Sequence, residues 1–166
     1  TNPNPDAFRD LSHFVISSEV VHRTDEGSLT VTPYAIASDM TFRLHFLPSQ
    51  AIEETRHVAV GALSSWQRTL GPDTELLAGI DLEWAQGELF EEQLIPRVFS
   101  YTPGVHYDYT VDSFSAAPFS RIRHQATQRL SLQAGLRLNH TGYDYQNHEP
   151  DFDPSDRFQR PDDRRD

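Results

Sequence analysis

This sequence of 166 residues is 37% hydrophobic, has a mean hydropathy of −0.59 and contains no cysteine, so disulfides and thiolate metal sites are excluded. Its 25 acidic residues against 14 basic ones give a net charge of −11, which argues against a nucleic-acid surface, because phosphate binding needs a cationic patch. No apolar stretch of about 18 residues is present, so any membrane contact would be made by strands.

The first third of the chain predicts two strands. Residues 1–11 are polar and predict a connecting segment, which leads into a strand over residues 12–24. Asp25–Gly27 predicts a tight turn. Residues 29–47 then alternate with a period of two, which is typical of a strand. One face carries Tyr34, Ile36, Met40, Phe42, Leu44 and Phe46, and the other carries Ala35, Ala37, Asp39, Thr41, Arg43 and His45.

The middle of the chain predicts two more strands, joined by a short turn. A polar loop over residues 48–56 precedes alternation in which Val58, Val60, Ala62 and Trp66 share one face. The sequence Gly71–Thr74 predicts the turn. After it, the apolar face carries Leu76, Ala78, Ile80, Leu82 and Trp84, and the polar face carries Gly79, Asp81, Glu83 and Gly87.

The last third begins with a long predicted loop over residues 92–107. Residues 109–124 predict a less regular strand, because Phe114 and Phe119 fall on opposite faces. A short turn at 126–128 leads into a strand that continues to about residue 145. That strand opens with the clearest alternation in the chain, since one face carries Leu130, Leu132, Ala134, Leu136 and Leu138. Residues 146–166 are rich in Asp, Pro and Arg and predict a polar loop or disordered tail.

Two regularities connect these strands. The connections alternate between short and long, and Gly61, Gly79 and Gly135 all fall on the polar faces of their strands. Outer-membrane barrels combine tight turns at one end with long loops at the other, and their apolar faces meet lipid. We therefore expect an all-β fold, an antiparallel meander of about six long strands within residues 12–145, as a segment of a transmembrane β-barrel. Trp66 and Trp84 would face lipid, and packing in a sandwich core is the alternative.

Three runs of sequence also resemble a known family. The segments LTVTPYAIASDMTFRLHFLP, ELLAGIDLEWAQGEL and RLSLQAGLRLNHTGYDY resemble barrel strands of TonB-dependent outer-membrane receptors, and the similarity covers most of residues 12–145. The resemblance implies a receptor in the outer membrane of a Gram-negative bacterium that imports a scarce ligand such as a ferric siderophore, energised by TonB through a plug domain. That family's barrel has about 22 strands, so we expect this chain to be a fragment without plug or TonB box.

Catalytic and metal-binding motifs are absent from the sequence. Neither Gly-x-Ser-x-Gly, nor the phosphate-binding loop, nor the dinucleotide-binding glycine pattern occurs, so we expect no enzyme and no cofactor. The eight histidines do not form His-Glu-x-x-His. Residues 149–156 hold four acids but lack the spacing and glycine of an EF-hand, and they predict a solvated loop rather than a cation site.

Ligand contacts are expected on the long loop. The predicted ligand-binding residues combine groups that can charge-pair, stack and hydrogen-bond with an anionic aromatic metal chelate. They are Arg97, Tyr101, His106, Tyr107 and Tyr109. The alternative is that Tyr101 and Tyr107 only pin the loop to its neighbours.

Two other classes of protein stay open at this point. A small soluble lipocalin-like barrel would bury the apolar face around an apolar ligand, and alternation alone does not tell which face points inward. An outer-membrane enzyme is the third class, for which the sequence supplies no catalytic constellation.

Overall fold

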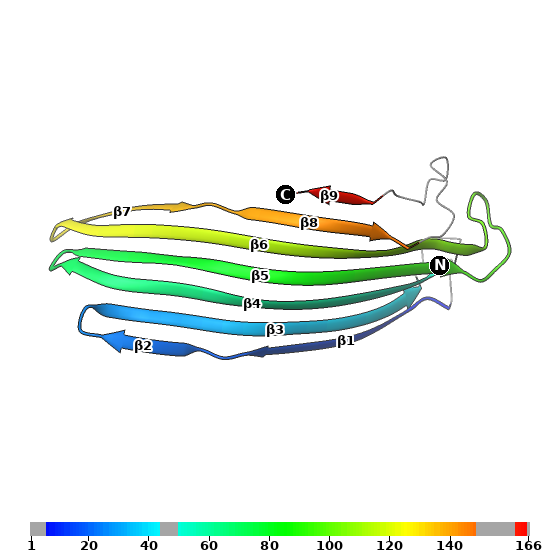
Figure 1. Ribbon diagram of the computed structural model, residues 1–166, viewed down its shortest axis with the longest axis horizontal. Coiled ribbons are helices and arrows are strands. Elements are labelled where there is room, and N and C mark those ends of the chain that lie inside the picture. The colour runs from blue at the N-terminus through cyan, green and yellow to red at the C-terminus, as the bar shows by residue number, and fades with distance from the viewer. Residues whose placement is uncertain (1–5, 44–49, 149–161, 166) are drawn as a thin grey trace.

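The computed structural model describes residues 6–43, 50–148 and 162–165. These residues form one antiparallel sheet of nine strands in the order β1-β3-β4-β5-β6-β8-β9, with β2 also on β3 and β7 also on β6 (Figure 1). The strands are β1 (Phe8–Ser17), β2 (Val20–Thr24), β3 (Gly27–Arg43), β4 (Ile52–Gly71), β5 (Thr74–Gln93), β6 (Gly104–Thr127), β7 (Leu130–Arg137), β8 (His140–Asn147) and β9 (Asp163–Arg165). Within these ranges there is no apolar helix of membrane-spanning length.

Six long lines of strand make up most of the sheet. β1 and β2 lie end to end along β3, and β7 and β8 lie end to end along β6. The ladder continues across both breaks, because the Ser18 amide donates to the Pro33 carbonyl at 3.1 Å and the Leu138 amide donates to the Pro118 carbonyl at 3.0 Å. The prediction of an all-β antiparallel meander with about six long strands is confirmed. Over the described residues the sheet is open, with β1 and β2 at one edge and β7 and β9 at the other.

All three short turns lie at one end of the sheet, and the loop between β5 and β6 lies at the other (Figure 1). We call these the turn end and the loop end. The turns before β3 and β5 lie where the sequence predicts them. The third turn comes two residues later than predicted, since β6 continues to Thr127. The Thr127 hydroxyl stabilises the turn there, accepting hydrogen bonds from the amides of Arg129 and Leu130 at 3.2 and 3.1 Å.

Several predicted boundaries were wrong because the ladders run further than the alternation does. Residues 8–11, predicted as part of the connecting segment, belong to β1 and pair with residues 40–43 of β3. β4 begins at Ile52, inside the predicted loop 48–56, and the β5–β6 loop shortens to residues 94–103. β8 extends to Asn147, and β9 lies within the predicted tail 146–166. The acidic run 149–156 lies outside the described residues.

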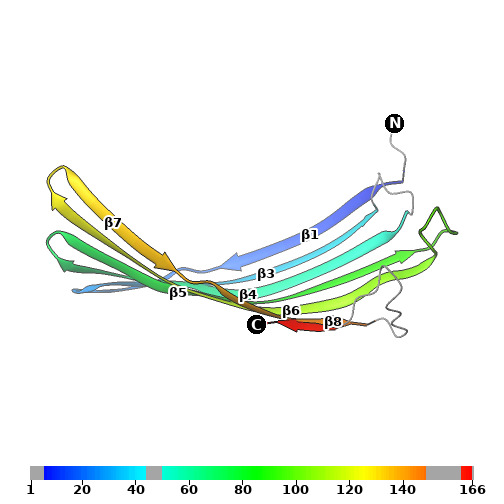
Figure 2. The same cartoon turned by 90° about the horizontal axis from the view of Figure 1, so that it is seen from above.

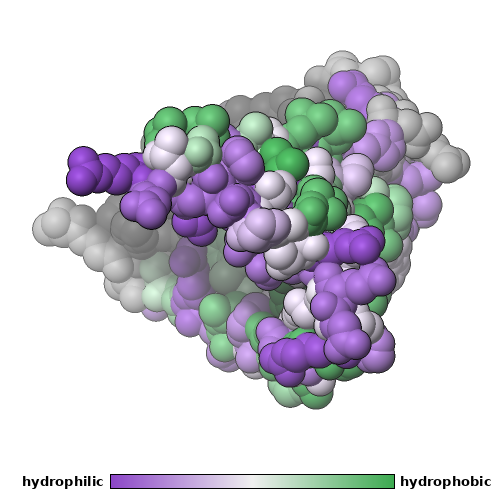
Figure 3. All heavy atoms as spheres, turned by 90° about the vertical axis from the view of Figure 1, so that its left-hand side faces the viewer, coloured by the Kyte–Doolittle hydropathy of each residue, from purple (hydrophilic) through white to green (hydrophobic). Residues whose placement is uncertain are grey.

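The register of the ladders defines two faces, because directly paired residues in antiparallel strands share a face. Gly61, Gly79, Gly87 and Gly135 all lie on one of them, which we call the glycine face. The four buried apolar residues also lie on this face, and they are Phe42, Ala59, Ala85 and Ala117. The glycine face is therefore the more enclosed one. The sheet bends into an arc along its strands (Figure 2), and hydrophilic and hydrophobic residues are interspersed where the turn end faces the viewer (Figure 3).

The two faces of β3 are reversed with respect to the prediction. Tyr34 and Phe42, predicted on the apolar face of this strand, lie on the glycine face with the polar sides of the neighbouring strands. The reversal is explained by the volume of the Tyr34 side chain, which fills the space over Gly61. A Cβ added to Gly61 would lie 2.5 Å from the Tyr34 ring, so the ring occupies the space that the glycine leaves. Large apolar side chains on β3 thus fill the enclosed face, and Ala35 and Ala37 lie on the opposite one.

Candidate functional site

The opposite face carries a continuous apolar band, and we call it the belt face. On β4, β5 and β6 the band covers the nine-residue segments Val58–Trp66, Leu76–Trp84 and Phe114–Ile122. Within these segments the side chains on the belt face are apolar except for Ser64 and Ser120. Apart from Leu76, which is only partly exposed, the large ones are between 38% and 52% exposed. Three neighbouring strands therefore present an apolar band of the same length to the surroundings.

Charged and polar groups bound the band at both ends. Towards the loop end, Val58 is followed on the belt face by Arg56, whose Nε lies 3.1 Å from Asp39 Oδ2. Towards the turn end, Trp66 is followed by Arg68, whose Nη2 lies 2.7 Å from Glu26 Oε2. The two tryptophans lie at opposite limits of the band, because Trp66 ends it on β4 and Trp84 ends it on β5. Indoles collect at such boundaries between apolar and aqueous surroundings.

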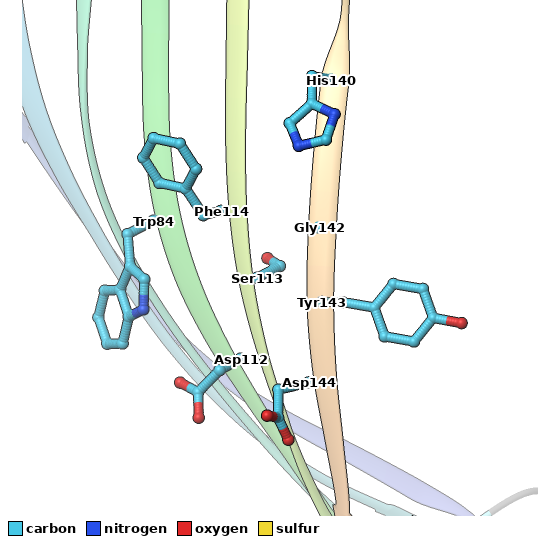
Figure 4. A pocket seen from close by; sticks show the side chains of 8 residues that line it. All are labelled: Trp84, Asp112, Ser113, Phe114, His140, Gly142, Tyr143 and Asp144. Atoms are coloured by element: carbon cyan, nitrogen blue, oxygen red, sulfur yellow. The ribbon is translucent and has the colours of Figure 1, made fainter. Parts of the chain in front are cut away.

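A hollow of about 230 Å³ lies where the band meets the charged groups at the loop end. Trp84, Phe114 and Gly142 stand in one cross-strand row, and Asp112 pairs with Asp144 in the next row. Figure 4 shows the two aromatic rings and both carboxylates on one side of the sheet, while another lining residue, Tyr143, points to the other side. The hollow exists because Gly142 brings no side chain to the row. The hollow is part of the boundary of the apolar band at its loop end.

The glycine face carries polar and charged side chains at the level of the apolar band. The Tyr34 hydroxyl donates to Glu83 Oε2 at 2.5 Å, and Arg137 Nη1 lies 2.6 Å from Asp81 Oδ2. Arg137 also donates from Nε to Asn139 Oδ1 at 2.9 Å. These groups line a cavity of about 420 Å³. The acidic polar face predicted for β5 is thus on the glycine face, where an arginine from β7 partly neutralises it.

Three of the predicted ligand-binding residues are used in packing the loop. His106 is 2% exposed, with Nδ1 2.9 Å from Glu91 Oε1 and Nε2 2.7 Å from the Thr102 carbonyl oxygen. The Tyr101 ring centroid lies 6.3 Å from that of His106, and the backbone of Tyr101 pairs with Val98. Arg97 is exposed, and its Nε donates to the Phe99 carbonyl at 3.0 Å. For Tyr101 this geometry favours the pinning alternative.

The other two predicted residues lie in the sheet. Tyr107 and Tyr109 belong to β6 and project on the glycine face near the loop end, opposite Glu91 and Leu89. The Tyr109 ring centroid lies 5.0 Å from that of Tyr145 on β8. The structure therefore separates the predicted set into two groups. The loop group is Arg97, Tyr101 and His106, and Tyr107 and Tyr109 form an aromatic group with Tyr145 on the glycine face. The second group can contact a ligand that enters from the loop end.

Sequence reasoning missed two residues that shape this region. Gln93 is 1% exposed, and its Nε2 donates to the carbonyl oxygens of Ile95 and Pro96 at 3.2 and 3.3 Å, so the loop wraps around it. Glu53 of β4 pairs directly with Glu91 of β5. Burial raises the pKa of Glu53, and the neighbouring Glu91 adds to the effect. Neither position has a local signal, because both roles depend on cross-strand neighbours.

Metal and family comparisons complete the picture of the site. Among the residues that the structure describes, no three histidine, aspartate or glutamate side chains lie close enough together to hold a metal ion. The chain is an all-β protein whose antiparallel sheet separates an exposed apolar band from an enclosed polar face. Comparison with protein-family models and with curated proteins finds no match.

Proposed function

We propose that this sheet is part of the wall of a transmembrane β-barrel in the outer membrane, with the belt face against lipid and the glycine face towards a polar interior. One observation carries the proposal, namely the nine-residue apolar band on each of three neighbouring strands, which is in register between β5 and β6 and shifted by two residues between β4 and β5. Nine residues extend roughly 30 Å along a strand, or somewhat over 20 Å at a tilt of about 40°. Barrels of this class carry an apolar band about 25 Å tall.

The charges on the opposite face support the same orientation. Asp81, Glu83 and Arg137 lie at the depth of the apolar band, and lipid on their face would remove them from water. A polar interior leaves them solvated or paired. The two faces of one sheet thus require two different surroundings, and lipid outside with water inside provides them.

The lipocalin-like alternative requires the reverse arrangement. A soluble barrel of that type encloses its apolar face around the ligand. Here the buried side chains lie on the glycine face, while Val60 and Phe114 on the belt face are 52% and 50% exposed. The geometry therefore favours a barrel with its apolar face outward.

Within the outer-membrane class, we assign the chain to a TonB-dependent receptor that imports a scarce ligand such as a ferric siderophore. The resemblance of three strand segments to that family supports the assignment. The aromatic group at the loop end of the glycine face, Tyr107, Tyr109 and Tyr145, supports it as well, because such rings can stack on an aromatic chelate. TonB would act through a plug domain.

The ligand assignment is tested with the double variant Tyr107→Ala and Tyr109→Ala in the full-length receptor. Loss of two ring contacts worth about 1 kcal/mol each should raise the KM for uptake of a radiolabelled ferric catecholate roughly tenfold or more. Thr110→Ala is the matched control, because Thr110 follows Tyr109 but projects on the belt face. Receptor level in the membrane is measured in parallel. Unchanged uptake at normal receptor level would remove the aromatic group from the ligand site.

A further inference from the structure

The cavity of about 420 Å³ on the glycine face has a floor of short side chains and walls of long ones. Its floor is β6, which brings only Ser115 and the 7% exposed Ala117 to this part of the face. Ser115 pairs with Glu83 and Ala117 pairs with Asp81, so the long side chains of β5 stand beside short ones. Binding sites for small molecules generally measure about 300 to 1,000 Å³, and this cavity falls within that range.

The polar groups of the walls are held in place from both sides. Tyr34 of β3 reaches across β4, and its hydroxyl donates to Glu83 Oε2 at 2.5 Å. Arg137 of β7 reaches over β6, with its Nη1 2.6 Å from Asp81 Oδ2 and its guanidinium carbon 5.7 Å from the centre of the Phe119 ring. The two carboxyl groups therefore have fixed orientations before a ligand arrives, which lowers the entropy cost of binding.

These contacts leave both donors and acceptors unused. Among the described residues, the second oxygen of each carboxyl group, Oδ1 of Asp81 and Oε1 of Glu83, accepts no hydrogen bond. Arg137 donates from Nε and Nη1, and its remaining N–H groups can still donate. Asn139 accepts from Arg137 with Oδ1, so its amide nitrogen is a further donor. The cavity thus offers acceptors on β5 and donors on the opposite wall.

A ligand that satisfies this lining must both donate and accept hydrogen bonds. Hydroxyl groups do both, whereas an ammonium group only donates and a carboxylate only accepts. The charges favour the same class, because Arg137 is paired with Asp81 and the remaining carboxylate already accepts a hydrogen bond. Leu63 and Tyr34 also line the cavity and can pack against the C–H groups of a ligand. These features together describe an uncharged molecule with several hydroxyl groups.

We propose that this cavity binds an uncharged, hydroxyl-rich ligand such as a sugar ring. Asp81 and Glu83 accept hydrogen bonds from the ligand. Arg137 and Asn139 donate to it. The site is separate from the aromatic group at the loop end, because six residues of β5, roughly 20 Å of strand, lie between Glu83 and the partner of Tyr109. The inference therefore does not depend on the ligand proposed for that group.

The test is saturation-transfer NMR on the full-length protein in micelles of a detergent without sugar groups. D-glucose is the uncharged probe, propylammonium and acetate are the charged probes, and micelles without protein give the background. Saturation of the protein methyl groups should pass to the ring protons of glucose and to neither charged probe. No transfer to glucose above the background would overturn the proposal. Transfer to a charged probe but not to glucose would overturn the assignment to hydroxyl groups.

Asn139→Leu tests whether glucose binds in this cavity. The substitution replaces one donor of the wall by an apolar side chain of similar size, at an exposed position between β7 and β8. The dissociation constant of glucose should rise roughly fivefold, as expected for loss of one hydrogen bond. Gln133→Leu is the matched control, because Gln133 is an exposed amide on the glycine face of β7 outside the cavity. It should leave the dissociation constant unchanged.

The same dissociation constant in Asn139→Leu as in the parent would show that glucose binds elsewhere and would overturn the assignment to this cavity. Ser115→Leu gives an independent result, because a leucine on the floor narrows the cavity without removing any of its charged groups. This variant should also weaken glucose binding. The parent alone decides whether glucose binds, even if neither variant folds.

Discussion

Ile80→Arg is expected to destabilise membrane assembly by about 2 to 4 kcal/mol, because an arginine near the middle of the bilayer carries this cost on the lipid side of a barrel. Ile80 is the central residue of the β5 band and is 39% exposed on the belt face. The measurement is the urea concentration at which half of the membrane-inserted protein is unfolded. The folded fraction is read from its heat-modifiable mobility on a gel. A loss of this size removes a large part of the stability of an ordinary domain.

Thr32→Arg is the matched control for this substitution. Thr32 lies on the glycine face of β3 opposite Leu63, which in turn pairs with Asp81. An arginine there enters the polar side of the sheet at a similar depth, close to an existing carboxylate, and it should cost less than about 1 kcal/mol. Equal losses for both variants would show that the two faces have the same surroundings and would contradict the proposed orientation.

Gly79→Ala is expected to have the second largest effect, a loss of about 1 to 3 kcal/mol or more from overpacking. A Cβ at this position would lie 2.0 Å from the Ser64 carbonyl oxygen and 2.6 Å from Cζ of the Phe119 ring. The ring can turn away, but the neighbouring backbone moves only if the ladder between β4 and β5 distorts. The urea midpoint again reports the change.

Gly87→Ala serves as the control on the same strand and the same face. Its added Cβ would lie 4.0 Å from the nearest atom, the Arg56 carbonyl oxygen, which is an ordinary contact. The free energy of unfolding derived from the midpoint should fall by less than about 0.5 kcal/mol, or rise slightly because alanine restricts the unfolded chain. If both variants lose the same stability, the close approach at Gly79 is not what requires glycine there.

Most of the fold was predictable because one physical rule governs it. Alternation with a period of two fixed which residues share a face, and the turns at Asp25 and Pro72 fixed which strands are neighbours. The rule does not tell which face of a given strand joins which face of the next. β3 was reversed for this reason, since Tyr34 fills the space over Gly61 and that contact spans 27 positions in the sequence.

The candidate site was less predictable than the fold. Tyr107 and Tyr109 continue the alternation of β6, so their common face follows from the sequence. The burial of His106 does not, because it depends on a bulge that shifts the register by one residue and on a carboxyl group from β5. A strand pattern carries no signal for an inserted residue unless a glycine or a break in hydrophobicity marks it.

The central claim is that the belt face meets lipid, and tryptophan fluorescence in vesicles of brominated lipid tests it most directly. Both tryptophans lie on the belt face, at opposite limits of the band. Bromine quenches an indole only on close approach, so both should be quenched relative to vesicles of ordinary lipid. A variant with Trp66→Phe, Trp84→Phe and Phe119→Trp leaves this sheet with one indole, on the glycine face. The account predicts strong lipid quenching in the parent and little in this variant, and the opposite result would contradict it.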